Sequence, residues 1–254
     1  MKKISTKDYV LKELELNKGK YITGTALSKV LGLSRNSIWK AINELREQGY
    51  NIISVTNKGY MLESDSDIIS VQAISNYLNH LKNTLINNQT ENNDLIDQII
   101  NDIIIYDKLA STNQTAKTLL ITGETDKNII IAKTQTHGLG HDNSSFDSPA
   151  GGIYMSIMLK PEYLKCDSLK SKTIGEIVKN SIVTSERERI VLDSQLNRIY
   201  INNIKAAGIM TEYFADLETG KINGYVIGIG ITYPDIKKNQ TIANILFSLY
   251  MLLY

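Results

Sequence analysis

Cysteine and long apolar runs are nearly absent from this 254-residue chain. A single cysteine, Cys166, excludes an internal disulfide framework and CxxC metal sites, so a reducing cytoplasm is the expected location. The opening residues MKKISTKDYV lack the apolar core of a signal peptide. The apolar C-terminal stretch ILFSLYMLLY is shorter than the roughly 20 residues that span a bilayer, and it predicts a core helix rather than a membrane anchor.

An excess of positive charge is missing as well. Lysine and arginine total 28 against 27 for aspartate and glutamate, so no global field attracts nucleic acid. Any DNA affinity must therefore come from a local basic surface. Hydrophobic residues make up 42% of the chain, which is enough for a sizeable core in one large domain or two unequal ones.

Residues 1–63 have the pattern of three short helices followed by a hairpin. Apolar residues recur at helical spacing, with Ser34 as the expected N-cap of the third helix and Gly49 as its stop. In YNIISVTNKGYMLE, apolar residues alternate around residues 57–59, which predicts a β-hairpin with its tip there. A hairpin after a helix-turn-helix is a wing, so we expect a winged helix domain.

The third predicted helix presents polar side chains suited to a DNA groove. A recognition helix contacts base edges from its N-terminal residues, and cations beside it or at a wing tip reach phosphates. Two alternatives remain open, because winged helices also serve as protein–protein modules and exposed basic side chains are often only solvated. The residues expected to contact operator DNA are Ser34, Arg35, Asn36, Ser37, Lys40 and Lys58.

The rest of the chain divides into a linker and a second domain. Residues 64–100 include the Asn-rich stretch KNTLINNQTENNDLIDQ, which has too few apolar residues for a core of its own and predicts a helical, Asn-rich linker. Over residues 101–254, strand-like runs such as NIIIAKT and GIYMSIML alternate with helical ones, which is typical of an α/β or α+β domain.

Several of these stretches resemble one family, the bifunctional biotin protein ligases and biotin operon repressors of the BirA type. Residues 22–62 resemble its winged helix, KLASTNQTA its Ser-Thr-Asn motif, and QTHGLGHDNSSFDSPAGGIYMSI its adenylate loop. KAAGIMTE resembles its lysine strand and VIGIGIT its glycine strand. The resemblance implies an α+β fold, with a winged helix-turn-helix before a class II synthetase-like mixed-sheet domain of the biotin/lipoate protein ligase type.

The resemblance also implies a ligand site. Such ligases make biotinyl-AMP from biotin and ATP and pass the biotin to a lysine of an acceptor protein. Hydroxyl, amide and backbone groups read a ureido ring, and glycines let a strand approach a flat ligand closely. Lys205 would be the catalytic lysine of an active enzyme. The residues expected to bind a biotin-like ligand are Ser111, Thr112, Asn113, Gln135, Gly138, Lys205, Gly208, Gly228 and Gly230.

The adenylate loop departs from the family pattern, GRGRxGR followed by tryptophan. The three arginine positions hold Leu139, His141 and Ser144, the third glycine is Asn143, and Phe146 replaces the tryptophan. Adenylation brings two anions together and relies on Arg, Lys and Mg²⁺ to neutralise them. The loss of three fixed charges therefore predicts a site that does not use ATP and Mg²⁺.

A second family motif, KWPND, falls on SQLNR when counted back from Lys205. Arg198 then replaces the aspartate that the family associates with ATP and metal, and a cation there would repel Mg²⁺. A deletion that shifted the register would leave Asp193 as the nearest replacement. The chain also ends at Tyr254, within the helix that precedes the family's small β-barrel.

Several of these residues also have a purely structural explanation. Ser111 with Gln114 is also a helix capping box, and glycines such as Gly228 are common in strands packed against helices. His137 and His141 share a glycine-rich loop but have no further predicted ligands, so no metal site is expected.

The sequence therefore predicts a transcriptional regulator that binds operator DNA, and the family resemblance implies a homodimer. Its degenerate ligase domain would sense biotin or a related ligand, or only dimerise. The enzyme alternative is an active bifunctional ligase and repressor that uses biotin, ATP, Mg²⁺ and a biotin-acceptor protein. A third alternative is an interaction protein that binds neither DNA nor ligand.

Overall fold

The computed structural model describes residues 5–85, 92–123, 128–140, 144–159, 171–185, 188–215, 220 and 222–253. The chain separates into two compact units, Met1–Tyr77 and Leu78–Tyr254. Helix α4 (Val71–Leu85) contains the boundary between them. No helix in the described ranges is both long and apolar enough to cross a membrane.

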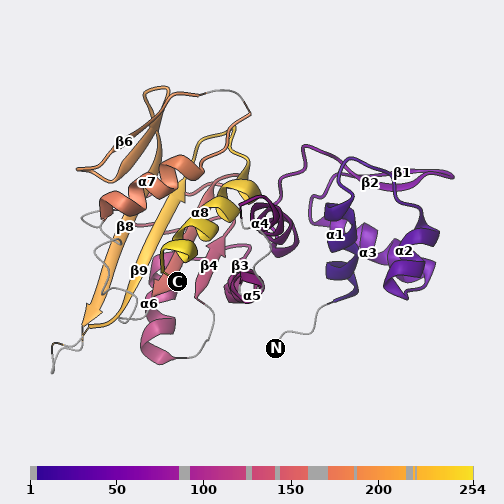
Figure 1. Ribbon diagram of the computed structural model, residues 1–254, viewed down its shortest axis with the longest axis horizontal. Coiled ribbons are helices and arrows are strands. Elements are labelled where there is room, and N and C mark those ends of the chain that lie inside the picture. The colour runs from indigo at the N-terminus through magenta and orange to yellow at the C-terminus, as the bar shows by residue number, and fades with distance from the viewer. Residues whose placement is uncertain are drawn as a thin grey trace. The chain divides into compact units, whose positions relative to one another are not determined.

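The first unit consists of three helices and a two-stranded hairpin (Figure 1). The predicted N-cap is confirmed, because Ser34 Oγ accepts a hydrogen bond from the Ser37 amide at 3.1 Å. Gly32 ends the second helix with φ 64°, a left-handed conformation that glycine adopts without strain. The elements are α1 (Thr6–Leu16), α2 (Gly24–Leu31), α3 (Arg35–Glu47), β1 (Ile52–Val55) and β2 (Gly59–Leu62).

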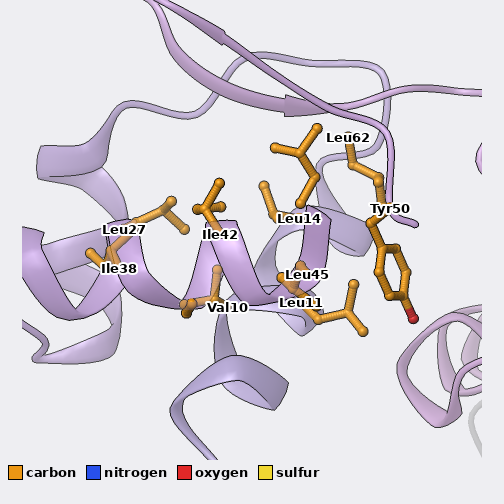
Figure 2. Close-up of a cluster of buried hydrophobic side chains, with 11 residues drawn as sticks. Val10, Leu11, Leu14, Leu27, Ile38, Ile42, Leu45, Tyr50 and Leu62 are labelled. Atoms are coloured by element: carbon orange, nitrogen blue, oxygen red, sulfur yellow. The ribbon is translucent and has the colours of Figure 1, made fainter. Parts of the chain in front are cut away.

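One apolar cluster holds this unit together (Figure 2). The helical spacing read from the sequence places Ile38, Ile42 and Leu45 on the inner side of α3, and all three are fully buried. Leu62 of β2 completes the cluster, so the hairpin packs on the same core as the helices. The outer side of α3 is thereby fixed toward solvent.

The second unit is built on a seven-stranded mixed sheet, in the order β3-β4-β5-β9-β8-β7-β6. Strands β3 and β4 are parallel and all other neighbours are antiparallel, which confirms the expected α+β class. The strands are β3 (Ile103–Tyr106), β4 (Ile129–Ala132), β5 (Ile153–Leu159), β6 (Ile190–Asp193), β7 (Arg198–Ile201), β8 (Ile204–Ala215) and β9 (Ile222–Ile231).

Helices cover this sheet. Helix α6 (Thr112–Thr122) packs on the face that carries Ile130, Met158 and Val226. Helices α7 (Ser171–Ser181) and α8 (Lys238–Leu253) pack on each other and cross the sheet in the view of Figure 1. The C-terminal apolar stretch is thus a core helix, as predicted.

Helix α5 (Asn92–Asp102) lies in the segment expected to be a linker. Its Ile96 and Ile99 are buried, and the helix packs against α8. Part of the expected linker is therefore packed structure of the second unit.

Candidate functional site

A cavity of about 70 Å³ opens on the α6 side of the sheet in the second unit. The start of α6, the loop that follows Gln135, the β6–β7 turn and the middle of β8 and β9 all contribute to its wall. Gly138 lies just outside the wall, where a Cβ would meet the Phe146 carbonyl oxygen at 2.5 Å. The other predicted ligand residues all line the cavity: Ser111, Thr112, Asn113, Gln135, Lys205, Gly208, Gly228 and Gly230.

Main chain forms the floor of this cavity. One row of cross-strand neighbours runs from Arg198 through Gly208 and Gly230 to Tyr154. The next row pairs Met210 with Gly228 and Gly228 with Ser156. Since the central positions lack side chains, other side chains can lie directly on the backbone of β8 and β9.

The ring of Phe146 lies on the first row. A Cβ added at Gly208 would come within 3.3 Å of the ring, and one at Gly230 within 2.5 Å. Tyr154 meets the ring edge to face at 6.4 Å, and Lys205 Nζ lies 5.7 Å from the ring centroid. The Phe146 side chain thus covers the glycine floor.

Tyr154 anchors the loop beneath this ring. Its hydroxyl donates a hydrogen bond to the Pro149 carbonyl oxygen at 2.8 Å. Burial, assisted by the negative charge of Asp147, raises the pKa of Tyr154 to about 12, so the phenol keeps its proton above the pH at which a free tyrosine loses it.

Asn113 covers the second row and joins three elements. Its Oδ1 accepts a hydrogen bond from Ser156 Oγ at 2.6 Å, and its Nδ2 donates one to Glu212 Oε2 at 2.9 Å. Glu212 also forms an ion pair with Lys117 of α6. The Asn113 amide lies so close to Gly228 that a Cβ there would collide with it.

Ser111, Thr112 and Gln135 have structural partners. Ser111 is the N-cap of α6 and accepts from the Gln114 amide, which agrees with the capping interpretation. Gln135 Oε1 accepts from the Thr112 amide at 2.7 Å and from Thr112 Oγ1 at 3.1 Å. Gln135 Nε2 donates to Ser148 Oγ at 2.9 Å, which fixes the orientation of the amide.

The predicted DNA-contacting residues all belong to the first unit, on α3 and its N-cap and on the hairpin turn. Ser34, Arg35, Asn36, Lys40 and Lys58 are exposed. Arg35 Nη2 donates to Thr25 Oγ1 at 2.7 Å, and Lys58 Nζ lies 5.7 Å from the Tyr21 ring.

Ser37 is half-buried, and its hydroxyl is hydrogen bonded to that of Ser34 at 2.8 Å. These two serines thus cap the helix, whereas Arg35, Asn36 and Lys40 extend from it.

Two further residues of α3 were not predicted. Trp39 is 53% exposed on α3, directly before Lys40. Its signal was an aromatic residue off the core spacing of Ile38 and Ile42. Arg46 donates from Nε and Nη2 to the Ile52 carbonyl oxygen, at 3.0 and 2.7 Å, and so ties the wing to the helix.

Each of the two units matches a known protein family model. Residues 6–61 match the model of an HTH domain, and residues 105–232 match that of the biotin/lipoate A/B protein ligase family. The chain belongs to this ligase family. Both matches agree with the BirA-type resemblance and with the order of the two units.

Relatives with both functions in their names are similar to the chain. The bifunctional ligase/repressor BirA of Bacillus subtilis is 30% identical over 216 residues, 83% of this chain and 60% of the relative. BirA of Escherichia coli is 24% identical over 231 residues, 90% of this chain and 64% of the relative. The chain therefore spans under two thirds of the length of these relatives.

A solved biotin protein ligase from Aquifex aeolicus, in complex with biotin and ATP, is 18% identical. The match has a TM-score of 0.45 and covers 59% of this chain and 69% of that chain.

Within this family member, two of the expected arginine positions line the cavity as Leu139 and Ser144. His141 and Asn143 fall outside the described residues, as does Cys166. Arg198, which the count back from Lys205 aligns with the family's aspartate, lines the cavity, and Asp193 is not part of the wall. Across the described ranges, no group of three or more His, Cys, Asp or Glu could hold a metal ion.

Asp193 has a role in the β6–β7 turn. Its Oδ1 accepts from the amides of Gln195 and Leu196, at 3.0 and 3.1 Å. Beside this turn, Asn197 adopts φ 49°, and its buried Oδ1 has no hydrogen-bond partner among the described residues.

Proposed function

We propose that this chain is a DNA-binding transcriptional regulator whose ligase-like unit binds biotin or a related small ligand without adenylating it. The observation that carries the proposal is the make-up of the cavity wall. Leu139 and Ser144 of this wall align with two arginines of the family's adenylate loop, and Arg198 aligns with the aspartate of its KWPND motif. The HTH match and the relatives named ligase/repressor support the DNA-binding half.

The residues present fit biotin. Ser111, Thr112 and Gln135 supply hydroxyl and amide groups for a ureido ring, and the glycine floor allows a flat ring to approach the backbone. The cavity of about 70 Å³ is small for such a ligand, so Phe146 must move off the floor when the ligand binds.

The residues present do not fit Mg²⁺ and ATP. A leucine and a serine cannot neutralise phosphate oxygens, and an arginine repels a divalent cation where a carboxylate would attract one. Each lost charged donor typically costs about 2.7–4 kcal/mol of transition-state stabilisation. We therefore expect that this chain does not adenylate its ligand.

On the first unit, Arg35, Asn36 and Lys40 would enter a groove of the operator, with Lys58 of the wing reaching a neighbouring phosphate. A homodimer on a palindromic operator is the expected assembly, because a two-fold axis relates equal half-sites.

An assay of biotin transfer tests the proposal. The purified chain is incubated with biotin, ATP, Mg²⁺ and a biotin-acceptor domain and read by streptavidin blot, beside Lys205→Ala and a known active ligase. We expect no signal from this chain. A signal that disappears in Lys205→Ala would overturn the proposal and establish the alternative, an active bifunctional ligase and repressor.

That alternative has one observation in its favour. Lys205, the family's lysine, lines the cavity together with seven other predicted ligand positions. The same blot decides between the two functions.

A further inference from the structure

We infer that the cavity takes an anionic ligand, whose carboxylate or phosphate is held between Arg198 and Lys205 without a metal ion. This inference rests on the proposed function, since it names the ligand class of the same site. It goes further by giving Arg198 a binding role of its own.

The first observation is the charge of the cavity wall. Arg198 and Lys205 both line it, and no carboxylate residue of the described chain does so. Two like charges on one small cavity repel each other, and an anion between them removes the repulsion. A neutral ligand would leave it in place.

The second observation is the lack of partners. In the described part of the chain, the side chain of Arg198 makes no hydrogen bond or ion pair, and Lys205 Nζ faces only the Phe146 ring. Some other cations of this unit are neutralised, as Lys117 is by Glu212 and Lys133 by Asp107. The cavity cations are thus available to a ligand.

The third observation explains why Asp193 leaves Arg198 free. The two residues are cross-strand neighbours of the β6–β7 hairpin. The Asp193 carboxylate accepts two amides of the turn instead, and no ion pair joins it to Arg198 among the described residues.

The fourth observation is the side of the sheet on which the Arg198 side chain lies. Arg198 is the register partner of Gly208, so its side chain starts on the same side of the sheet as the glycine row that Phe146 covers. A planar guanidinium at the end of that row can hold two oxygens of one carboxylate or phosphate. The ligand body would then lie along the glycines, in the place that Phe146 occupies.

The test is isothermal titration calorimetry of the full chain with biotin, with the neutral biotinamide and with AMP. Each titration is run with Mg²⁺ and with EDTA. We expect biotin to bind at least about tenfold more tightly than biotinamide, since a hydrogen bond to a charged group is worth about that factor. EDTA should change nothing.

Arg198→Gln should remove most of this advantage, and Arg198→Lys should keep much of it. The matched control is Arg189→Gln, an exposed arginine before β6 that is not part of the cavity wall. Should Arg198→Gln fail to fold, the comparison of biotin with biotinamide is made on Arg198→Met, which keeps an aliphatic stem without the charge.

Outcomes separate the two proposals. AMP binding that depends on Arg198, without biotin binding, would support the anion site with a phosphate source and remove biotin from the proposed function. Equal affinities for biotin and biotinamide, a requirement for Mg²⁺, or no binding of either anion would overturn the inference. A positive transfer blot overturns only the proposed function.

Discussion

Phe146 rests on Gly230, where an added Cβ would lie 2.5 Å from the ring carbon Cε1. Gly230→Ala should therefore lift the ring off the floor. Because the chain has only three phenylalanines, fluorophenylalanine labelling gives a ¹⁹F NMR spectrum of three resonances, assigned by Phe146→Leu. We expect the Phe146 resonance to shift in Gly230→Ala.

The matched control is Gly24→Ala, where the nearest atom to a new Cβ is a Tyr60 carbon at 3.7 Å. An unchanged Phe146 resonance in Gly230→Ala would show that the ring does not lie on this glycine in solution.

Asn113→Ala should destabilise the second unit. The substitution removes the partner of the buried Ser156 hydroxyl and one partner of Glu212. Unpaired buried polar groups cost about 1–3 kcal/mol, so differential scanning calorimetry should show a lower unfolding temperature. Gln114→Ala, on the exposed neighbour, should leave it nearly unchanged. Equal unfolding temperatures of the two variants would show that the hydrogen bonds of Asn113 do not stabilise the second unit.

Arg35→Ala with Lys40→Ala should weaken DNA binding at a fixed salt concentration. An operator is first selected from random duplexes with the full chain, and affinity is then measured by fluorescence anisotropy of labelled DNA. Each lost phosphate contact should lower the salt dependence of log K by about 1. Lys133→Ala, in the second unit, is the control. Unchanged affinity in the double variant would count against α3 as the reader.

Trp39 should report DNA binding directly. It is the chain's only tryptophan, and 53% of its side chain is exposed on α3. We expect its fluorescence to change when the selected duplex is added. A spectrum that ignores saturating DNA would place α3 outside the interface.

High pH should weaken the fold through two buried tyrosines. Burial raises the pKa of Tyr154 to about 12, with help from Asp147, and burial likewise raises the pKa of Tyr50 to about 12. An unfolded tyrosine loses its proton near pH 10, so only the unfolded state gains from deprotonation between about pH 10 and 12. The stability each phenol contributes is complete below about pH 10 and is lost as the pH rises through about 12.

Urea unfolding followed by circular dichroism at about pH 9 to 12 should show the decline, and Tyr154→Phe should reduce its slope. Tyr9→Phe, at an exposed position, should not. A slope that Tyr154→Phe leaves unchanged would contradict this assignment.

Local signals made the first unit predictable. A cap such as Ser34 acts within a few residues of sequence, and α3 begins directly after it, as expected. The β6–β7 hairpin was not expected, because its turn depends on Asp193 accepting two amides and on Asn197 at positive φ, which leave little trace in apolar periodicity.

The residues that line the cavity could be predicted from the sequence, but the position of the Phe146 ring over its floor could not. Family motifs pointed to its residues, and the sheet register brings Gly208 and Gly230 side by side. That Phe146 covers those two glycines depends on how a loop folds back over the sheet. No spacing in the sequence encodes the position of that ring.

The main-chain floor of the cavity has a consequence for how this protein can change over evolution. The hydrogen-bonded backbones of β8 and β9 form the floor. Its glycines have no side chain to exchange, so a substitution there could only add atoms that fill the cavity. Ligand preference is therefore left to the few side chains above and beside it, chiefly Phe146, Asn113 and Arg198. Three codons could thus redirect the pocket to a new metabolite while the scaffold beneath stays the same.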